Sequence, residues 1–457
     1  MKKKCFLPLL FVFLFSGCMS TKAVEKQSAV SPLEAELQKM RQAGIPTTVE
    51  ELNLPEIPDE ENGALVYREV FKLSDSLKEA FKDDWQYIPY EGTVKWEDAT
   101  EEQKKRITDL ILNNPEFIKL YLLLGKAINM KCRFLTDEEL GEGAGIMLPH
   151  LAKLRGAARL LAARAKIESE SGNIDNALDH TLICFRTAKS LSYEPILISS
   201  LVRIAIGSIA ISILQEIVNK GEAEIGFYEE ALHEIKKEKE SFIVSFGLQG
   251  EGILGGLWVY NRISKGLIKD TFELFHLFGT DTKLEKKNEL ISAYLPFAEN
   301  DIVFYLQTIS KFILLAKDPY WKARDELRKT DESIHALDEE EYFISRRILP
   351  ALSRVNLQEA RFDALLGAAE IGIENRIYRE KHGKFADSLS QLTPEILPSL
   401  PLDPFTGKDY IYRRTNKGFI VYSVADNLKD DGGIPQFSEE GKKSWNFDIV
   451  WEDKGNL

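Results

Sequence analysis

The sequence predicts a mainly helical protein that ends in a small α/β domain with a short antiparallel sheet. From Asn62 to about Glu380, apolar residues recur every three or four positions, which is the period of amphipathic helices. Near the C-terminus, aromatic and branched residues alternate on either side of Asn416-Lys417-Gly418, a pattern typical of a β-hairpin. With 457 residues and 44% hydrophobic composition, the chain can form cores for two or more domains.

The first residues have the layout of a secretory signal. Three lysines are followed by an apolar run too short to span a bilayer comfortably, and two small residues precede Cys18. The string FSGC resembles the lipobox of bacterial lipoproteins, although that family prefers Leu where this chain has Phe15. The resemblance implies that residues 1–17 are a signal peptide and that Cys18 is lipidated and becomes the mature N-terminus. An uncleaved anchor is the alternative, and both place the body in the cell envelope, outside the cytoplasm and facing the periplasm or the cell exterior.

The composition limits the classes of partner. Removal of the signal peptide leaves 56 of the 59 basic residues against 72 acidic ones, a formal charge of −16. Such an acidic body argues against nucleic acid and against charge-driven binding to anionic lipid. We expect a membrane partner through the lipid anchor alone, together with an envelope protein or a glycan.

Two cysteines remain after those of the export signal, Cys132 and Cys184. They are enough for one disulfide but not for a disulfide framework. Because both lie among apolar neighbours, two buried thiols are the equal alternative.

Changes in composition and hydrophobic pattern along the chain predict four regions: a signal peptide at 1–17, a tether at 18–50, a helical domain at 51–348 and an α/β domain at 349–457. The clearest element is a helical hairpin in which one helix runs to about Ser171 and ends at Gly172, and Asn173 or Asp175 starts the next. The spacing of Leu161, Ala165, Gly172 and Ala177 resembles one tetratricopeptide repeat, without a second copy at a regular period. The helical domain is therefore predicted to be an irregular, tetratricopeptide-like array of hairpins.

Two apolar segments need separate interpretation. Residues 195–218 are apolar for a helix length but contain Arg203 and several serines, which favours a buried helix over a transmembrane one. The string GEGILGG starting at Gly250 satisfies G-x-G-x-x-G, but its flanks are not a strand and a helix in a βαβ unit. We therefore interpret these glycines as sites of close helix packing or as a hinge, and not as a dinucleotide-binding motif.

No motif in the sequence names a reaction. The histidines lack metal-ligand spacing, and neither a nucleophile elbow nor a phosphate loop is present. The sequence favours a non-catalytic protein over an enzyme, and no catalytic residue is predicted. The rival hypothesis is an envelope hydrolase with two carboxylates facing each other across a cleft of the helical domain.

The last hundred residues carry a specific resemblance. A long helix from about Leu352 to Glu380 ends at Gly383, and LPLDPFTGKDYIY, YSVADNLKDDGG and DIVW follow in that order. This order resembles the globular head of the type II secretion major pseudopilin. Upstream strings such as PDEENGALVYREVF are similar to a family of large exported bacterial lipoproteins that end in this head and have no assigned activity. The chain has a lipobox and a large helical region instead of a pseudopilin stem, so reuse of the head does not carry the pseudopilin function with it.

The acidic C-terminal loop is the one predicted ion site. Asp426, Asp430, Asp431 and Asp448 crowd a short stretch, and carboxylates with glycine-exposed carbonyls are the ligands that calcium prefers. The pseudopilin resemblance implies Asp426 and Asp448 as ligands, whereas Asp430 and Asp431 are candidates by proximity. The alternative is an acidic turn in which aspartates cap backbone amides.

We therefore expect a lipid-anchored envelope protein with a non-catalytic binding or scaffold role, whose α/β head is stabilised by calcium. The hydrolase and an accessory factor of a type II secretion-like system are the alternatives.

Overall fold

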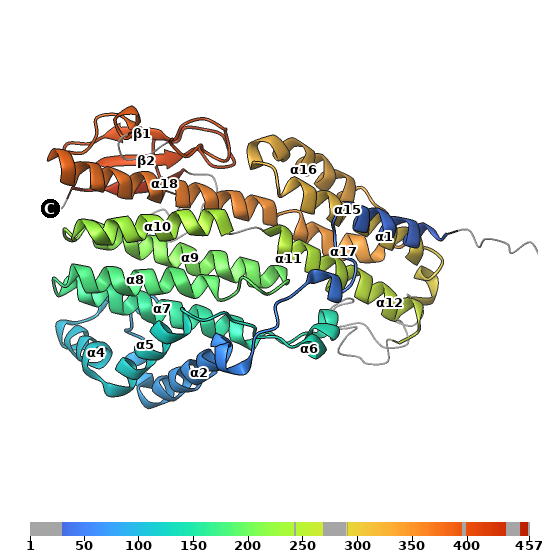
Figure 1. Cartoon of the computed structure of the whole chain (residues 1–457), viewed down its shortest axis with the longest axis horizontal. Coiled ribbons are helices and arrows are strands. Elements are labelled where there is room, and N and C mark those ends of the chain that lie inside the picture. The colour runs from blue at the N-terminus through green and yellow to red at the C-terminus, as the bar shows by residue number, and fades with distance from the viewer. Residues whose placement is uncertain are drawn as a thin grey trace, which may run out of the picture.

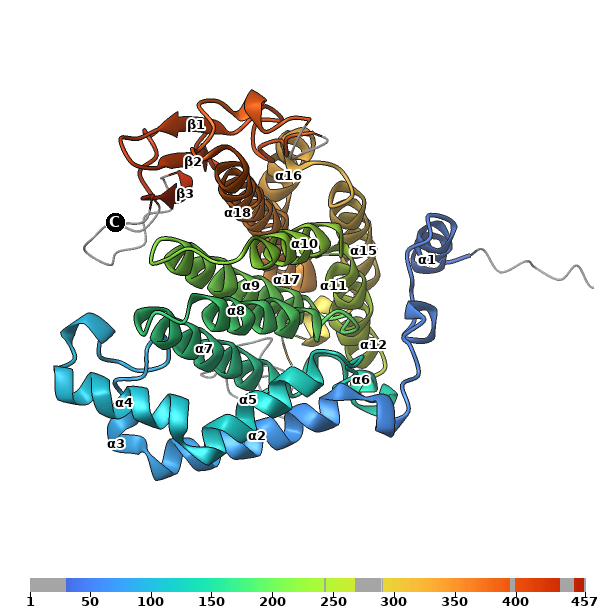
Figure 2. The same ribbon diagram turned by 60° about the vertical axis from the view of Figure 1, so that its left-hand side comes forward.

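A computed structural model of the chain describes residues 30–241, 244–267, 289, 291–394, 399–435 and 448–455. The fold is mainly helical with a three-stranded sheet near the C-terminus, which confirms the predicted class (Figures 1 and 2). The predicted signal peptide, Cys18 and the first part of the predicted tether lie outside the described residues.

Most of the described chain is α-helical. The first helices are α1 (Pro32–Gln42), α2 (Gly63–Ala80), α3 (Lys82–Trp85), α4 (Glu101–Asn113), α5 (Pro115–Ala127), α6 (Asp137–Gly141), α7 (Pro149–Glu170), α8 (Ile174–Lys189) and α9 (Leu197–Val218). The later ones are α10 (Ile225–Ser241), α11 (Val244–Gly250), α12 (Trp258–Ser264), α15 (Ala298–Leu315), α16 (Tyr320–His335), α17 (Phe343–Leu352) and α18 (Val355–His382). A π-helical segment, η5 (Glu251–Leu257), joins α11 to α12, and a short 3-10 turn, η4 (Gly143–Gly145), follows α6.

The predicted hairpin is present as α7 and α8. Gly172 adopts a φ of +84° between them, a conformation that glycine takes without steric cost. Helices α7, α8, α9, α10 and α18 lie side by side, with α2 and α5 against α7 on the outer side (Figure 1). Helices α11, α12, α15, α16 and α17 form the other end of the molecule, where α1 packs against α15.

Helix α9 is the apolar segment that the sequence predicts to be buried. By length and composition alone, α9 and the run 225–264 could each cross a membrane. In this structure α9 contacts α7, α8, α11 and α18, and its Arg203 is paired inside the body with Glu238, at 2.7 Å and 3.0 Å. A buried guanidinium with a bidentate carboxylate partner is consistent with a helix in a large core.

The sheet follows the predicted order. Strands β1 (Ile411–Arg414) and β2 (Phe419–Ser423) form the expected hairpin, and β3 (Ile449–Asp453) pairs antiparallel with β2. Helix α18 packs against β2 and β3 and ends at Gly383, which has a φ of +71°.

Glycines on α18 allow aromatic rings to lie directly on the helix. A Cβ atom on Gly367 would stand 2.2 Å from the Tyr410 hydroxyl, and one on Gly372 would stand 2.2 Å from Nε1 of Trp451. The close approach of these rings fixes the sheet domain against α18 and buries Trp451 completely.

The helical region and the C-terminal region share one continuous hydrophobic core. The boundary predicted between residues 348 and 349 falls inside α17, and buried residues such as Leu161, Ile211, Leu366 and Trp451 belong to the same cluster. Independent folding of residues 349–457 therefore stays a prediction, and such a fragment would expose the face of α18 that packs on α9 and α10.

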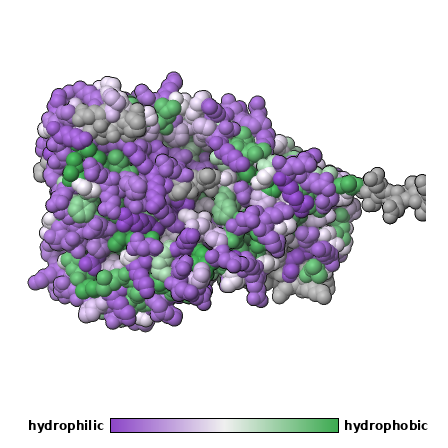
Figure 3. All heavy atoms as spheres, viewed as in Figure 1, coloured by the Kyte–Doolittle hydropathy of each residue, from purple (hydrophilic) through white to green (hydrophobic). Residues whose placement is uncertain are grey.

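The face of the molecule seen in Figure 3 is mainly hydrophilic. Hydrophobic atoms gather at its lower left, where α2, α4 and α5 lie, and the exposed Leu122 belongs to α5. Single exposed apolar residues of this kind are ordinary on soluble surfaces.

The buried pair of Arg376 and Asp453 gives a first testable prediction. Both side chains are at most 1% exposed, and the guanidinium donates two hydrogen bonds of 2.5 Å and 2.7 Å to the carboxylate. Replacing Arg376 by Met leaves a buried charge without its partner, so we expect a loss of about 3–5 kcal/mol in the free energy of unfolding. Chemical denaturation followed by circular dichroism measures this loss.

The control is Arg328→Met, which removes a pair with Glu332 in which both side chains are more than 60% exposed. Its expected cost is below about 1 kcal/mol. Equal losses for the two variants would contradict a structural role of the buried pair.

Candidate ligand-binding pocket

The pocket is built around the continuous helical run formed by α11, η5 and α12. The glycine string predicted to serve close packing does so: a Cβ atom on Gly250 would stand 1.5 Å from the carbonyl oxygen of Pro195, and one on Gly256 would stand 2.2 Å from the ring of Tyr305. The segment is helical throughout, so it is not a phosphate-binding loop. The π-helical step is a deviation that frequently occurs at functional sites.

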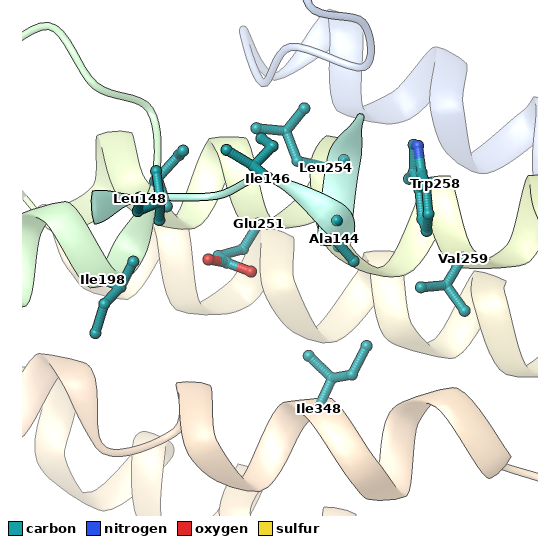
Figure 4. Close-up of a pocket in the computed structure, with 13 residues that line it drawn as sticks. Ala144, Ile146, Leu148, Ile198, Glu251, Leu254, Trp258, Val259 and Ile348 are labelled. Carbon is teal, nitrogen blue, oxygen red and sulfur yellow. The ribbon is translucent and has the colours of Figure 1, made fainter. Parts of the chain in front are cut away.

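The cavity beside this run has a volume of about 320 Å³ and is mainly apolar (Figure 4). That volume lies within the usual range for small-molecule pockets, roughly 300–1,000 Å³. The residues that line it come from η4 and the chain after it, the start of α9, the η5–α12 run and α17: Gly143, Ala144, Gly145, Ile146, Leu148, Ile196, Ile198, Glu251, Leu254, Gly255, Trp258, Val259 and Ile348.

Among the described residues that line this pocket, Glu251 is the only charged one. Its carboxyl group points into the cavity (Figure 4). Its Oε1 atom accepts a long hydrogen bond of 3.4 Å from the Leu197 amide. Burial raises the pKa of Glu251, because the surroundings disfavour the ionised form more than this single donor stabilises it. A neutral carboxyl group can donate one hydrogen bond and accept another.

Trp258 closes one end of the pocket. Gly143 adopts a φ of +56°, and a Cβ atom there would stand 2.3 Å from the indole ring, so glycine allows η4 to lie flat on Trp258. The indole Nε1 donates to the carbonyl of Gly141 at 3.3 Å, and the Arg262 guanidinium lies 4.7 Å from the ring centre.

The surroundings of the pocket also carry exposed apolar side chains. Met147, between the lining residues Ile146 and Leu148, is 70% exposed, and the lining residue Ile198 is 46% exposed. An apolar cavity next to apolar surface residues suits a ligand that arrives from a hydrophobic environment.

The four predicted calcium ligands are all described, and each has polar partners. Asp426 accepts two hydrogen bonds from Arg361, at 2.7 Å and 3.2 Å, which ties the loop to α18. Asp430 accepts from the hydroxyl of Tyr422 at 2.8 Å and from Arg413 at 3.0 Å. Two of the four carboxylates are thus neutralised by arginines.

Asp431 and Asp448 are brought next to each other. The Asp431 amide lies 3.5 Å from one oxygen of Asp448, whose other oxygen accepts from the amide of Gly433 at 2.8 Å. Asp448 is fully buried, and burial raises its pKa. Among the described residues, no group of three or more His, Cys, Asp or Glu side chains is placed to hold a metal ion. The calcium site stays a prediction, and residues 436–447 of the loop are outside the described part.

The remaining predicted positions fall as follows. Cys132 and Cys184 are free buried thiols, and burial raises the pKa of Cys132 to about 11 and that of Cys184 to about 12. Thiols with such pKa values are poor nucleophiles at neutral pH. Cys18, the predicted lipidation site, is outside the described residues.

Comparisons with known proteins identify no relative of this chain. No family model, no curated protein and no solved structure matches it.

The sequence did not single out the residues of the pocket. The one available signal was Glu251 itself, an acidic residue inside a glycine-rich apolar run. Ile198, Trp258 and Ile348 come together only through packing of α9, α12 and α17.

The raised pKa of Glu251 predicts a pH-dependent stability. The folded chain binds a proton at this carboxyl more tightly than the unfolded chain does, so the resulting stabilisation is full below the ordinary carboxyl pKa and is lost as the pH rises through the raised pKa. Glu251→Gln removes the ionisation, so we expect its melting temperature to gain a few degrees on the wild type between pH 5 and pH 9. Scanning calorimetry across this range measures the difference.

The control is Glu138→Gln on the surface of α6, where the same charge is removed from an exposed position. The difference in melting temperature between the wild type and Glu251→Gln should change with pH. If it does not, or if Glu138→Gln shows the same change, the pKa of Glu251 is not raised in the folded chain.

The calcium prediction is tested on the whole chain. An ion bound only by the folded state stabilises it by about 2.7 kcal/mol at a hundredfold excess over Kd, so the melting temperature should be several degrees higher in millimolar calcium than in chelator. The double variant Asp426→Ala with Asp448→Ala should lose this difference. Identical melting of the wild type in calcium and in chelator would favour the acidic turn, in which Asp430 and Asp448 cap the amides of Gly432 and Gly433.

Proposed function

We propose that this chain is a lipid-anchored protein of the cell envelope that binds a small apolar molecule in the pocket around Glu251, without catalysis. The observation that carries this proposal is the cavity of about 320 Å³ with apolar walls and one carboxyl group among its described lining residues. This composition is the usual one for binding sites of small molecules, in which a few polar groups set the orientation.

The chemistry of the pocket defines the ligand class. When protonated, the carboxyl group of Glu251 can donate a hydrogen bond to a hydroxyl or carbonyl oxygen, while Leu254, Val259 and Ile348 contact an apolar body. An anionic ligand is disfavoured because no basic side chain is among the described residues that line the pocket. The apolar walls favour a neutral aliphatic or aromatic molecule with one polar end.

A hydrolase is less well supported at this site. Hydrolysis by carboxylates needs two carboxyl groups that flank the reacting bond, and Glu251 is the one carboxyl group among the described residues that line the pocket. A single carboxyl group that accepts one long hydrogen bond suits recognition.

The predicted anchor would keep the pocket near the membrane. Thirteen residues separate Cys18 from Pro32, the first residue of α1, and they span at most about 45 Å. Helix α1 is fixed to α15 by a hydrogen bond of 3.0 Å from Gln307 to Glu36. Because α15 also contacts α12, this attachment lies at the pocket end of the molecule.

Two structural resemblances belong to this proposal. The α7–α8 hairpin supports a tetratricopeptide-like character, and the long α18 followed by an antiparallel sheet supports a pseudopilin-like head. We assign a scaffold role to the helical hairpins and to the head. In this role the sheet of the head covers α18, and any bound calcium stabilises the acidic loop of the head. An accessory role in a secretion system would rest on the head alone.

The ligand proposal is tested with 1-decanol as the probe. The mature chain is secreted with Cys18→Ser, so that no acyl group is attached, and melted with and without saturating decanol. We expect the melting temperature to rise by a few degrees, since a ligand that binds only the folded state stabilises it.

The blocking variant is Ala144→Trp, which places an indole at the pocket, and the matched control is Ala336→Trp on an exposed turn after α16. The decanol effect should disappear in the first and persist in the second. A shift of equal size in both variants, or none in the wild type, would contradict binding in this pocket.

Lipidation of Cys18 is tested separately. Metabolic labelling with a fatty-acid analogue should tag the wild type and leave Cys18→Ala untagged. A single acyl chain binds membranes only marginally, so firm anchoring requires the additional chains of a lipoprotein modification. Equal labelling of both chains would remove the anchor from the proposal while leaving the pocket untouched.

A further inference from the structure

A second cavity opens on another part of the molecule, where the predicted helical region meets the α/β head. It has a volume of about 540 Å³ and lies between α18, the end of α10, the turn from α15 to α16 and the loop at 402–404. It shares no lining residue with the pocket around Glu251.

One face of α18 supplies the polar side chains of this cleft. Asn356, Glu359 and Asp363 are three and four residues apart, so they project from the same side of the helix. All three line the cleft.

Asn356 is the clearest sign of a missing partner. Its side chain is only 4% exposed, yet neither its Oδ1 nor its Nδ2 atom has a hydrogen-bond partner among the described residues. Leaving a buried amide unsatisfied is unfavourable, because no hydrogen bond offsets the loss of its contacts with water. A ligand that both donates and accepts a hydrogen bond would remove this cost.

The two carboxyl groups have free acceptor capacity. Glu359 accepts one hydrogen bond of 2.8 Å from the Val244 amide, and Asp363 accepts none within the described part of the chain. Burial, together with the repulsion from Asp363, raises the pKa of Glu359 to about 8, and burial raises that of Asp363 to about 7. A cation between them would stabilise the ionised forms.

Lys239 fills this role only in part, because its positive charge lowers the pKa of Asp363 by less than burial raises it. The ammonium of Lys239 is held by Glu370 at 2.7 Å, and Asp403 is held by the Phe405 amide and the Ser423 hydroxyl. Lys317 and Asp318 are exposed at the edge.

Aromatic side chains stand beside the carboxyl groups. Trp321 is 39% exposed and its ring lies against Gly407, where a Cβ atom would stand 2.6 Å away. Tyr320 packs edge-on against Phe405, with ring centres 5.4 Å apart. Such rings provide flat apolar faces and attract cations.

We infer that this cleft binds an amino sugar, whose ammonium group is held by Glu359, Asp363 and Asn356 and whose adjacent hydroxyl completes the hydrogen bonding of Asn356. An ammonium has three donors, and these side chains offer it three acceptor groups. The neighbouring hydroxyl accepts from Asn356 Nδ2, and the sugar ring lies toward Trp321 and Tyr320.

The arrangement fits binding better than hydrolysis. A glycosidase places its two carboxyl groups on opposite sides of the bond that it cleaves. Glu359 and Asp363 project from one side of one helix, and the carboxyl group on the facing loop, Asp403, is already hydrogen-bonded.

The test measures binding of glucosamine by the whole chain at pH 7 by isothermal titration calorimetry, with glucose and N-acetylglucosamine as probes that lack the charge. We expect heat of binding for glucosamine and none for the two neutral sugars. Binding should also release protons, because the cation lowers the pKa of both carboxyl groups, and titrations in buffers of different ionisation enthalpy detect this release.

The first variant is Asp363→Asn, which keeps the shape and removes one charge. We expect binding at least about tenfold weaker, the size of one lost charge-assisted hydrogen bond. The matched control, Asp83→Asn on the exposed surface of α3 and outside the lining of the cleft, should bind like the wild type. Trp321→Ala is the second variant, and it tests the sugar ring contact independently of charge and should also weaken binding.

Other outcomes would overturn the proposal. Equal binding of glucosamine and N-acetylglucosamine would exclude recognition of the ammonium group. Binding of manganese ions that is lost in Asp363→Asn, with no heat from glucosamine, would make the cleft a metal site. Release of reducing sugar from a chitosan oligomer would make it an enzyme, and absence of any heat would leave the cleft without this ligand.

Discussion

The whole architecture depends on burying α18 together with its charged side chains. This helix is the layer between the sheet and the helices α9 and α10, so it has almost no solvent-facing side along its second half. Glu374 is fully buried 3.1 Å from the ammonium of Lys236, and Arg376 is bound to Asp453 of β3. Because an unpaired charge in such a place is very costly, these pairs fix how α10, α18 and the sheet lie relative to one another.

Both cavities follow from this arrangement. The first turns of α18 face the turn between α15 and α16. Asn356, Glu359 and Asp363 on this part of α18 therefore form one wall of the second cavity. Helix α17 precedes α18 directly and contributes Ile348 to the apolar pocket. The apolar cavity with its single carboxyl group and the acidic cleft share no lining residue, so the chain offers two separate cavities of different chemistry.

Much of the fold was predictable because local patterns and packing agree. Gly172 ends α7, Gly383 ends α18, and the alternation around Lys417 gives a hairpin, each through a local backbone preference that the tertiary structure does not override. The partners of the predicted calcium ligands were not predictable in the same way. The aspartates of the C-terminal loop are close in sequence, yet the arginines that bind them come from elsewhere: Arg361 of α18 binds Asp426, and Arg413 of β1 binds Asp430.

By itself, the sequence determined the mainly helical class, the hairpin of α7 and α8, and a β-hairpin with one more strand after it. For the glycine string it left close helix packing and a hinge open. Hydrophobic periodicity and glycine positions act over a few residues, so they are visible in the chain. Only the tertiary structure decided that Glu251 and Ile348 line one pocket and that the Asn356 side chain finds no hydrogen-bond partner among the described residues. Burial and hydrogen bonding of this kind depend on which distant segments meet, and in this chain that depends on where α18 packs.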